Sequence, residues 1–512
     1  MIATSPKSLL RNGLYKSTVL RYTGFLIVFI GLLLIFPAAL ALFLDENCLI
    51  FLIPSAVVIP IGLIVLFLFR EDKEGIRITS GVLMIGGTFL IVLLIGSAPY
   101  AVFGMSPIDS MFESLSGFTT TGFTVVSDFE AFPDSLFVWR SMTQWVGGIS
   151  VLLIFMYMLP VMGLGSRGFF INEMSGSGTG NLSVRLKDSV GSFLKIYMAL
   201  TLAQIILLVL LGMNLIDSLC ITFSTVSTGG FATDPNSLTD YGWGIKASVM
   251  FFMFLGGTNF YLHYKGLYKK MYNAYVKNTE FRWTVGWYLF IAVLIGILMT
   301  FAGKAGVLNN FGESLFSVIS AGTSTGFAVT DYADSGVWSA QLCMMLLLLV
   351  AFIGGMSGST AGGVKMYRIV IIIKHVKNSI YKILHPMAVY DIKMDEHSVE
   401  ESSVSGAFVT VILFALTVTI TFICLMMTGI LPSDSIGLAV SSVSNTGVVI
   451  GGHGSFYDLY MLNSSAKIIM MSAMFLGRLE IATALLLFMP GFWKEVRRNM
   501  KSDKSRGHSD SE

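Results

Sequence analysis

The sequence predicts an all-α polytopic membrane protein, because it is apolar, poor in charge and divided into long apolar runs. Of its 512 residues, 54% are hydrophobic and 12% are charged, against about 25% charged in a typical soluble domain. A soluble fold of this size would have too little charge to cover its surface. The four cysteines show no CxxC spacing, so neither a disulfide scaffold nor a cysteine metal site is expected.

Ten apolar runs are long enough to cross about 30 Å of hydrocarbon, which takes about 20 residues. They are Tyr22–Phe43, Leu49–Phe69, Ser80–Tyr100, Phe137–Leu159, Val190–Met213, Ile245–Tyr264, Trp283–Phe301, Trp338–Phe352, Ala407–Gly429 and Lys467–Phe488. The first run is too long for a cleavable signal peptide, and no small-residue cleavage site follows it.

The polar segments between these runs have a one-sided charge pattern. Lys and Arg gather in alternate segments, such as the one with Lys265, Lys269, Lys270 and Lys277, whereas the others are mainly acidic. By the positive-inside rule, both termini are predicted to be cytoplasmic, which agrees with an even number of spans. Because the basic residues lie in short loops, membrane lipid and not nucleic acid is the expected partner.

Four segments on the acidic side are too short to span and share one pattern. Each begins with an acidic residue and Ser, and each has a Gly 13 positions after the acidic residue. These segments are 109–123, 217–231, 313–327 and 434–448, and their glycines are Gly122, Gly230, Gly326 and Gly447. Because they align without a gap, the sequence predicts four repeats of span, short helix, Gly-containing loop and span, after two extra spans.

The chemistry of the repeat favours a cation filter. An acidic residue followed by Ser suits a helix N-cap, and the negative C-terminal end of the helix dipole then faces the loop. Glycine permits φ > 0, so successive carbonyls can turn towards one axis, as in potassium filters. The predicted ligand residues are Thr120, Thr121, Gly122, Thr228, Gly229, Gly230, Ser324, Thr325, Gly326, Asn445, Thr446 and Gly447. Helix packing by small residues is the alternative; it is favoured for any single segment but not for the set of four.

These loops resemble those of the Trk/Ktr/HKT superfamily of potassium transporters. The resemblance rests on Phe118–Gly122, Ser227–Phe231, Thr323–Phe327 and Ser444–Gly447, and on the stretches Gly257–Tyr264, Gly354–Lys365 and Leu476–Glu480. The two extra N-terminal spans resemble the TrkH-type pore-forming subunit. The resemblance implies one pore per protomer, a homodimer, and a cytosolic TrkA-type nucleotide-binding ring that gates the pore. It also implies a preference for potassium, since all four glycines are present, although the fourth loop departs from the others at Asn445 and Val448.

The second span of the third repeat is interrupted between residues 354 and 363. Its glycines, Gly354, Gly355, Gly358, Gly362 and Gly363, make it a poor helix. Unwound backbone at membrane depth is tolerated beside a wet cavity, and the resemblance implies an intramembrane gate loop. A plain kink and a phosphate loop are the alternatives, although the Lys that follows comes one residue too late for a Walker A motif.

Two buried charges are also expected to act at the pore. Arg478 lies in the last span, where a charge is costly unless it faces water or a partner, and is predicted to belong to the gate. The alternative is a buried ion pair with Glu480 or Glu113. Glu113 is itself expected to support the filter by hydrogen bonds.

The predicted organisation follows the repeats. It comprises an N-terminal two-helix extension (1–78), pore repeat 1 (79–165), a cytoplasmic loop (166–188), pore repeat 2 (189–266), a loop (267–281), pore repeat 3 with the gate loop 354–363 (282–383), a loop (384–403), pore repeat 4 (404–493) and a cytoplasmic tail (494–512). The expected docking surface for a cytosolic partner comprises the segments Gly165–Asp188, Lys265–Arg282 and Lys374–His397.

The predicted function is potassium uptake across a bacterial inner membrane, with K⁺ as the transported ion and without catalysis or an organic cofactor. Sodium- or proton-coupled potassium symport and a less selective monovalent cation channel are the alternatives. A membrane-embedded enzyme is disfavoured, because the sequence offers no HExxH motif, paired Asp or Ser/His pair at membrane depth. An apolar-solute carrier would not need four matched loops.

Overall fold

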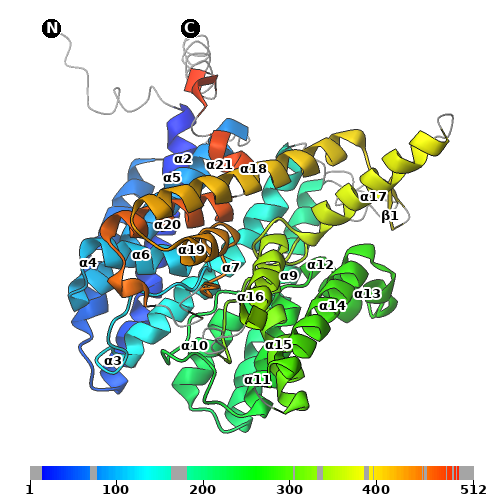
Figure 1. The fold of residues 1–512 in the computed structure, drawn as a ribbon. Coiled ribbons are helices and arrows are strands. Elements are labelled where there is room, and N and C mark those ends of the chain that lie inside the picture. Colours follow the sequence, from blue (N-terminus) through cyan, green and yellow to red (C-terminus); the bar gives the residue numbers. More distant parts are fainter. Residues whose placement is uncertain are drawn as a thin grey trace, which may run out of the picture. The chain divides into compact units, whose positions relative to one another are not determined.

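The computed structural model is almost entirely helical (Figure 1). It describes residues 14–69, 78–162, 182–303, 306–330, 338–385, 391–395, 397–451, 454, 458–479, 481–486, 489–491 and 493–494. The strands of the described chain are β1 (Lys393–Met394) and β2 (His397–Ser398), which pair antiparallel. This content agrees with the predicted all-α class. Most of the predicted loop 166–188 and nearly all of the tail 494–512 lie outside the described residues.

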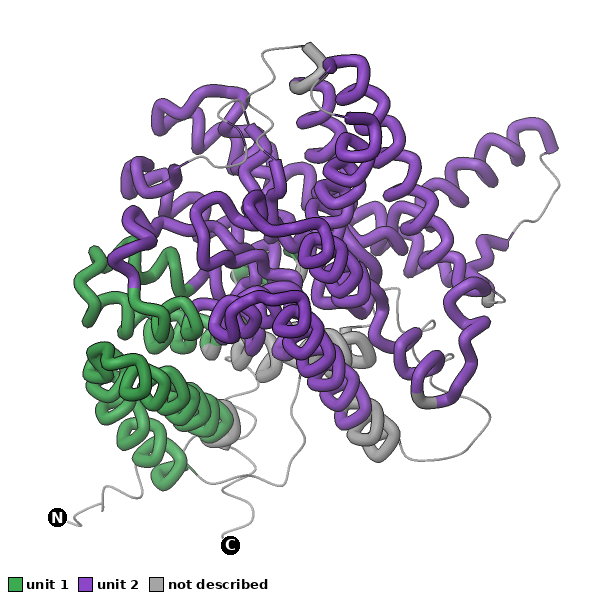
Figure 2. Tube along the Cα trace, turned by 90° about the horizontal axis from the view of Figure 1, so that it is seen from below, with its two compact units in different colours: residues 1–114, 133–139, 479–512 green, residues 115–132, 140–478 purple. Residues whose placement is uncertain are grey.

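The chain divides into two compact units (Figure 2). Unit 1 comprises residues 1–114, 133–139 and 479–512, and unit 2 comprises residues 115–132 and 140–478. The helices α6 (Pro107–Phe118) and α7 (Asp134–Met162) each contribute residues to both units.

Unit 1 is built on close helix packing. Its helices are α2 (Leu14–Leu33), α3 (Ile35–Phe43), α4 (Leu49–Leu68), α5 (Ile78–Phe103) and α21 (Ile481–Leu486). A Cβ on Gly62 of α4 would meet Val28 of α2, so small residues let these two helices approach closely. The Ser55 hydroxyl donates to the Gly31 carbonyl across the same interface, over 3.1 Å.

Unit 2 contains the remaining helices. They are α9 (Leu182–Leu210), α10 (Leu215–Val226), α11 (Trp243–Gly256), α12 (Phe260–His263), η1 (Tyr264–Tyr268), α13 (Asn273–Lys277), α14 (Thr279–Phe301), α15 (Val307–Gly322), α16 (Trp338–Ile353), α17 (Met366–Leu384), α18 (Glu401–Met427), α19 (Pro432–Ser444), η2 (Leu459–Met461) and α20 (Ser464–Arg478). The short helices α10, α15 and α19 each pack against the long helix that precedes them.

Five helices in the described residues are long and apolar enough to cross a membrane. They cover Leu20–Phe43, Leu49–Leu68, Gly191–Leu210, Thr279–Phe301 and Glu401–Met427. The predicted spans Ser80–Tyr100 and Phe137–Leu159 fall within α5 and α7. The predicted span Trp338–Phe352 corresponds to α16, which is shorter than these two helices.

Apart from the run Tyr22–Phe43, which has a one-residue break at Leu34 between α2 and α3, two of the predicted spans are not continuous helices. The run Ile245–Tyr264 is bent by 100° between α11 and α12. The Asn259 side chain accepts a bond from the Tyr261 amide over 2.8 Å, and so starts a new helix at the bend. The run Lys467–Phe488 is divided, because α20 ends at Arg478 and α21 begins at Ile481.

The short helices begin earlier than predicted. Asp109, Asp217 and Asp434 lie in the first turns of α6, α10 and α19, whereas Glu313 lies beyond the first turn of α15. The expectation that these residues are N-caps is therefore wrong. Asn214 caps α10 by accepting from the Ile216 amide over 2.9 Å. Three of the four carboxylates still lie at the positive end of a helix dipole.

Candidate functional site

The four short helices end in the same way. Counting back from each repeat glycine, the residue three positions earlier carries a hydroxyl that donates to the carbonyl four residues before it. The pairs are Thr119 to Leu115 (2.7 Å), Ser227 to Phe223 (2.6 Å), Thr323 to Ile319 (2.7 Å) and Ser444 to Val440 (2.7 Å). The repeat seen in the sequence therefore extends to individual hydrogen bonds.

The chain then turns through a left-handed residue in each loop. This residue lies two positions before the glycine and is Thr120 (φ 49°), Thr228 (φ 55°), Ser324 (φ 54°) or Asn445 (φ 54°). The amide that follows donates back to the carbonyl of a serine in the helix. The four bonds are Thr121 to Ser116 (2.9 Å), Gly229 to Ser224 (2.7 Å), Thr325 to Ser320 (2.9 Å) and Thr446 to Ser441 (2.8 Å).

The left-handed backbone is shared between glycine and other residues. Gly122, Gly230 and Gly326 have φ values of 93°, 80° and 89°. Gly447 lies outside the left-handed region, so the fourth loop does not use the positive φ that glycine permits. A left-handed conformation costs a non-glycine residue about 1–2 kcal/mol. The four residues that lie two positions before the glycines adopt it despite this cost.

The four loops contact one another in a closed ring. A Cβ on each repeat glycine would collide with the backbone of the next loop. The collisions are Gly122 with the Gly229 oxygen, Gly230 with the Thr325 oxygen, Gly326 with the Gly447 nitrogen, and Gly447 with the Thr121 oxygen. The contacts run from loop 1 through loops 2 and 3 to loop 4 and back to loop 1. The structure thus brings together all twelve residues that the sequence analysis assigned to the filter.

Side chains also join the first and fourth loops. Asn445 Nδ2 donates to Thr121 Oγ1 and to the Met474 carbonyl, each over 3.0 Å. Asn tolerates the left-handed region better than most residues, and it supplies two donors that a Thr or Ser there could not. The departure at Asn445 is therefore structurally useful.

The second loop uses a different support. It has Gly229 where the other loops have Thr121, Thr325 and Thr446, and the side chain of Gln144 on α7 occupies the space. Gln144 Nε2 donates to the Gly229 carbonyl over 2.8 Å, and its Oε1 accepts from the Phe231 amide over 3.2 Å. A Cβ on Gly229 would collide with the Gln144 amide group.

One turn earlier on α7, Arg140 supports the same loop. It donates to the Ala232 carbonyl over 3.2 Å and lies 4.0 Å from the centre of the Phe231 ring. The sequence analysis did not assign a role to Gln144 or Arg140. The signal was present, since a polar and a charged residue at i and i+4 inside an apolar run are functional candidates by default.

The glycine-rich segment 354–365 connects α16 to α17 without helix and lies against the loops. The Gly362 amide donates to Ser324 Oγ over 2.6 Å, and Thr228 Oγ1 donates to Thr360 Oγ1 over 3.1 Å. A Cβ on Gly362 would collide with the Ser444 carbonyl. The segment therefore contacts loops 2, 3 and 4 directly.

Left-handed glycines and a tight contact give the segment its path. Gly354, Gly358 and Gly363 have φ values of 75°, 72° and 79°. A Cβ on Gly355 would come within 2.6 Å of the Ala361 side chain. Lys365 also has a positive φ, of 80°, with a ψ of 131°.

The segment is also fixed to the bent helix and to α14. The Met356 amide donates to the Gly257 carbonyl over 3.1 Å, at the bend between α11 and α12. The buried Glu280 carboxylate accepts from the amides of Ser357 (2.7 Å) and Tyr367 (3.1 Å). These amides and that of Gly362 already have protein acceptors, which counts against the phosphate-loop alternative.

Arg478 is only 8% exposed and donates to backbone carbonyls. Its partners are the Thr360 carbonyl (3.1 Å), within the glycine-rich segment, and the Gly147 carbonyl (3.4 Å). Of the two carboxylates considered for an ion pair, Glu480 lies outside the described residues, and Glu113 is fully buried in α6 within unit 1. The support of the filter by Glu113 stays a prediction.

Acidic groups lie close to the second loop. The Asp217 carboxylate accepts from Thr233 Oγ1 over 2.7 Å. The pKa of Tyr241, in the segment between α10 and α11, is raised to about 12, mainly by burial and then by the carboxylates of Asp217 and Asp234. A pKa shifted by two carboxylates indicates a negative potential there, which attracts cations. Asp331 lies outside the described residues.

Helices long enough to cross a membrane, together with a ring of buried backbone loops, are typical of a polytopic helical membrane protein. Comparison with known families agrees: the TrkH family, described as cation transport proteins, matches residues 50–494. The chain belongs to this family, which confirms the resemblance seen in the sequence.

Similar proteins match over nearly their whole length. The Trk system potassium uptake protein TrkH of Halomonas elongata is 28% identical, over 93% of this chain and 99% of that protein. The Trk system potassium uptake protein TrkG of Escherichia coli is 29% identical, over 94% of this chain and 100% of that protein. The crystal structure of the potassium transporter TrkH from Vibrio parahaemolyticus is 26% identical, with a TM-score of 0.84 and coverage of 93% of this chain and 99% of that one.

Proposed function

We propose that this protein takes up potassium across a bacterial inner membrane through the ring of four loops. The main observation behind this proposal is the closed ring, in which each repeat glycine fits against the backbone of the next loop. The similar proteins named as potassium uptake proteins support the choice of ion.

The ring supplies the chemistry that an alkali cation needs. In loops 1 to 3, left-handed residues at two positions flank a residue of ordinary φ, and this alternation turns successive carbonyls towards the same side. Carbonyl oxygens then replace the hydration shell of the ion. The C-terminal ends of α6, α10, α15 and α19 add the negative ends of their dipoles. In this proposal the site residues are the twelve predicted from the sequence.

The glycine-rich segment acts as the gate in this proposal. It contacts three of the four loops, and Arg478 holds it through the Thr360 carbonyl. A fixed positive charge beside the ion path raises the barrier for a cation. A cytosolic TrkA-type nucleotide-binding ring would open the gate, and the protein would act as a homodimer with both termini in the cytoplasm.

The test is ion flux into proteoliposomes for potassium, rubidium and sodium, with the wild type and Gly122→Ser. The new Cβ would collide with the Gly229 carbonyl, and φ of 93° would be strained as well. We expect the wild type to prefer potassium and rubidium, and the variant to admit sodium because loops 1 and 2 are pushed apart.

Gly212→Ser is the matched control. Gly212 has φ of 89° but nothing within 4 Å of an added Cβ, so this change brings the backbone strain without the collision. It should keep the selectivity of the wild type. Equal selectivity of wild type and Gly122→Ser would contradict the filter assignment, and so would a wild type that carries no potassium even with its cytosolic partner supplied.

A further inference from the structure

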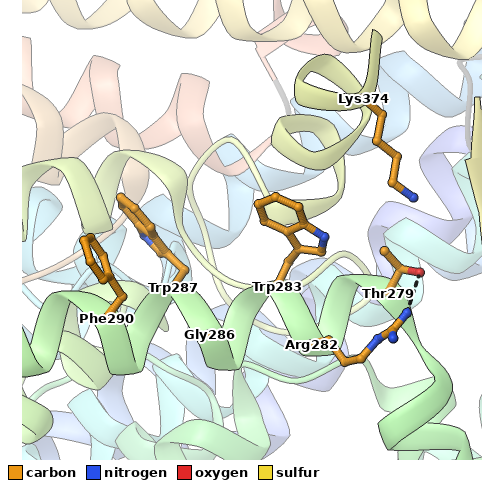
Figure 3. A pocket seen from close by; sticks show the side chains of 7 residues that line it. All are labelled: Thr279, Arg282, Trp283, Gly286, Trp287, Phe290 and Lys374. Carbon is orange, nitrogen blue, oxygen red and sulfur yellow. Dashed lines mark hydrogen bonds between the residues drawn. The ribbon is translucent and has the colours of Figure 1, made fainter. Parts of the chain in front are cut away.

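A cavity of about 600 Å³ lies beside the first half of α14 (Figure 3). Its lining residues are Thr279, Arg282, Trp283, Gly286, Trp287 and Phe290 of α14, and Lys374 of α17. The sequence analysis placed Thr279, Arg282 and Lys374 in loops expected to dock a cytosolic partner, and it assigned no role to the other four. All of them belong to unit 2.

The cavity is polar at one end and aromatic at the other. Figure 3 shows Lys374 extending from α17 towards Thr279 and Arg282, while Trp283, Trp287 and Phe290 follow one another along α14. The rings of Trp287 and Phe290 stack with centroids 6.3 Å apart. Gly286, between the tryptophans, leaves open space, because an added Cβ there would meet nothing within 4 Å.

The two ends lie at different membrane depths. The helix Thr279–Phe301 is a candidate span, so its first turn lies at a membrane–water interface whichever way the chain is oriented. From Thr279 to Phe290 the helix rises about 16 Å, which is roughly half of the hydrocarbon thickness. The basic residues are therefore at the level of lipid headgroups, and Phe290 is at the level of acyl chains.

The polar end has an excess of positive charge. Arg282 donates to Thr279 Oγ1 over 3.5 Å, and Lys374 donates to the Lys393 carbonyl over 2.6 Å. In the part of the chain that the structure describes, the acidic group that faces them is Asp395, whose carboxylate accepts from Asn278 Nδ2 (3.2 Å) and the Thr279 amide (2.6 Å). Burial lowers the pKa of Lys374, Asp395 opposes this, and Arg282 lowers it further. Two basic groups share one carboxylate that already caps α14.

We propose that this cavity binds one anionic phospholipid, with its phosphate between Arg282 and Lys374 and an acyl chain along Trp283, Trp287 and Phe290. Arg and Lys are the usual partners of phosphate, tryptophan favours the membrane interface, and basic pockets between membrane helices suit anionic headgroups. The proposal depends on the chain spanning a membrane and not on which ion it carries.

The test measures lipid binding directly on purified, delipidated protein. Native mass spectrometry is carried out with phosphatidylglycerol or phosphatidylcholine added at equal concentration. We expect the wild type to bind one phosphatidylglycerol in preference to phosphatidylcholine. Arg282→Gln and Lys374→Gln should each weaken phosphatidylglycerol binding about fivefold, and the double variant should abolish the preference.

Two further variants separate charge from shape. Lys377→Gln removes the same charge from the exposed face of α17, outside the cavity, and should leave the preference unchanged. Gly286→Phe puts a ring into the open space, at a position where an added Cβ meets nothing within 4 Å, so it should block both lipids while the protein stays folded. Phosphatidylglycerol with brominated acyl chains should quench the tryptophan fluorescence of the wild type. The quenching should be weaker in Trp287→Phe, which lacks one of the tryptophans that line the cavity.

Several outcomes would overturn the site. One is equal binding of the two lipids, and another is an equal loss of binding in Lys377→Gln. Displacement of the lipid by inorganic phosphate would assign the cavity to a free anion, and dissociation of a dimer by Gly286→Phe would assign it to a second copy of the chain. Potassium flux of the same variants is measured separately, so a failed lipid site with intact flux leaves the proposed transport function unaffected.

Discussion

At the residue scale, Gln144 shows how an apolar helix supports a loop that lacks a side chain of its own. Loops 1, 3 and 4 pair two hydroxyls around the turn, as in Thr119 with Thr121 over 2.7 Å. Loop 2 has Gly229 at this place, and the Gln144 amide satisfies the Gly229 carbonyl and the Phe231 amide instead.

Gln144→Leu should lower selectivity for potassium over sodium while most of the protein remains folded. The change leaves a buried carbonyl and a buried amide without their partner, at about 1–3 kcal/mol for each group, so loop 2 should relax. Selectivity is measured by flux into proteoliposomes, and folding by the thermal unfolding midpoint.

Gln204→Leu on α9 is the matched control. Gln204 is also fully buried, but neither its Nε2 nor its Oε1 has a hydrogen-bond partner in the described structure. Because the same substitution there removes an unsatisfied amide, it should leave selectivity unchanged and stability equal or higher. If both variants behaved alike, Gln144 would have no special role at loop 2.

Individual residues were predictable where a local pattern repeats. The acidic-to-glycine spacing predicted twelve residues that the structure brings together in the ring, whereas positive φ was considered for the glycines and not for the residues two positions before them. Thr120 and its counterparts take that conformation because their helices bind the next amide through a serine carbonyl. Gln144 lies in another element, 85 positions from its partner Gly229, and a single sequence does not reveal such a pairing.

At the element scale, the glycine-rich segment owes its path to contacts with other elements. It is held by Glu280 of α14, by the bend at Gly257 and by Arg478 of α20. The break in the predicted span Ile245–Tyr264 belongs to the same arrangement, since the Phe260 amide donates to the Gly358 carbonyl over 3.0 Å. Hydropathy alone could not predict the break, because its cause lies about 100 residues away in the chain.

Arg478→Gln should raise potassium flux in the absence of any cytosolic partner. Hydrogen bonds from a charged group are worth about 1.5–3 kcal/mol, so their loss should shift the gate towards the open state about tenfold or more. The removed positive charge should also lower the barrier for a cation. The measurement is rubidium uptake into proteoliposomes that contain only this chain.

Lys467→Gln serves as the control on the same helix. Lys467 is buried and donates to the Tyr460 carbonyl over 3.0 Å, so its loss removes a buried charge of α20 without touching the gate segment. Flux should stay at the level of the wild type. A rise in both variants would indicate general loosening of α20 and would count against a gate contact by Arg478.

At the scale of the whole molecule, the charge asymmetry of the loops predicts that both ends of the chain lie on the same side of the membrane. A fluorescent protein that folds only in the cytoplasm should be bright when fused to either end. An alkaline phosphatase that is active only outside should be inactive there, but active when inserted in the segment between α10 and α11. Active phosphatase at either terminus would contradict the predicted even number of spans.

The meeting of the first and fourth loops has a consequence for biosynthesis. Asn445 and Thr121 are 324 positions apart, and a ribosome adds about 5–20 residues each second. The first loop therefore waits roughly 15–65 s for its last neighbour. During that interval, three loops face a gap that exposes polar backbone, and non-local contacts of this kind are slow to form. Damage to the fourth repeat should consequently appear as a low yield of mature protein, cleared by quality control, before any change in ion preference is seen.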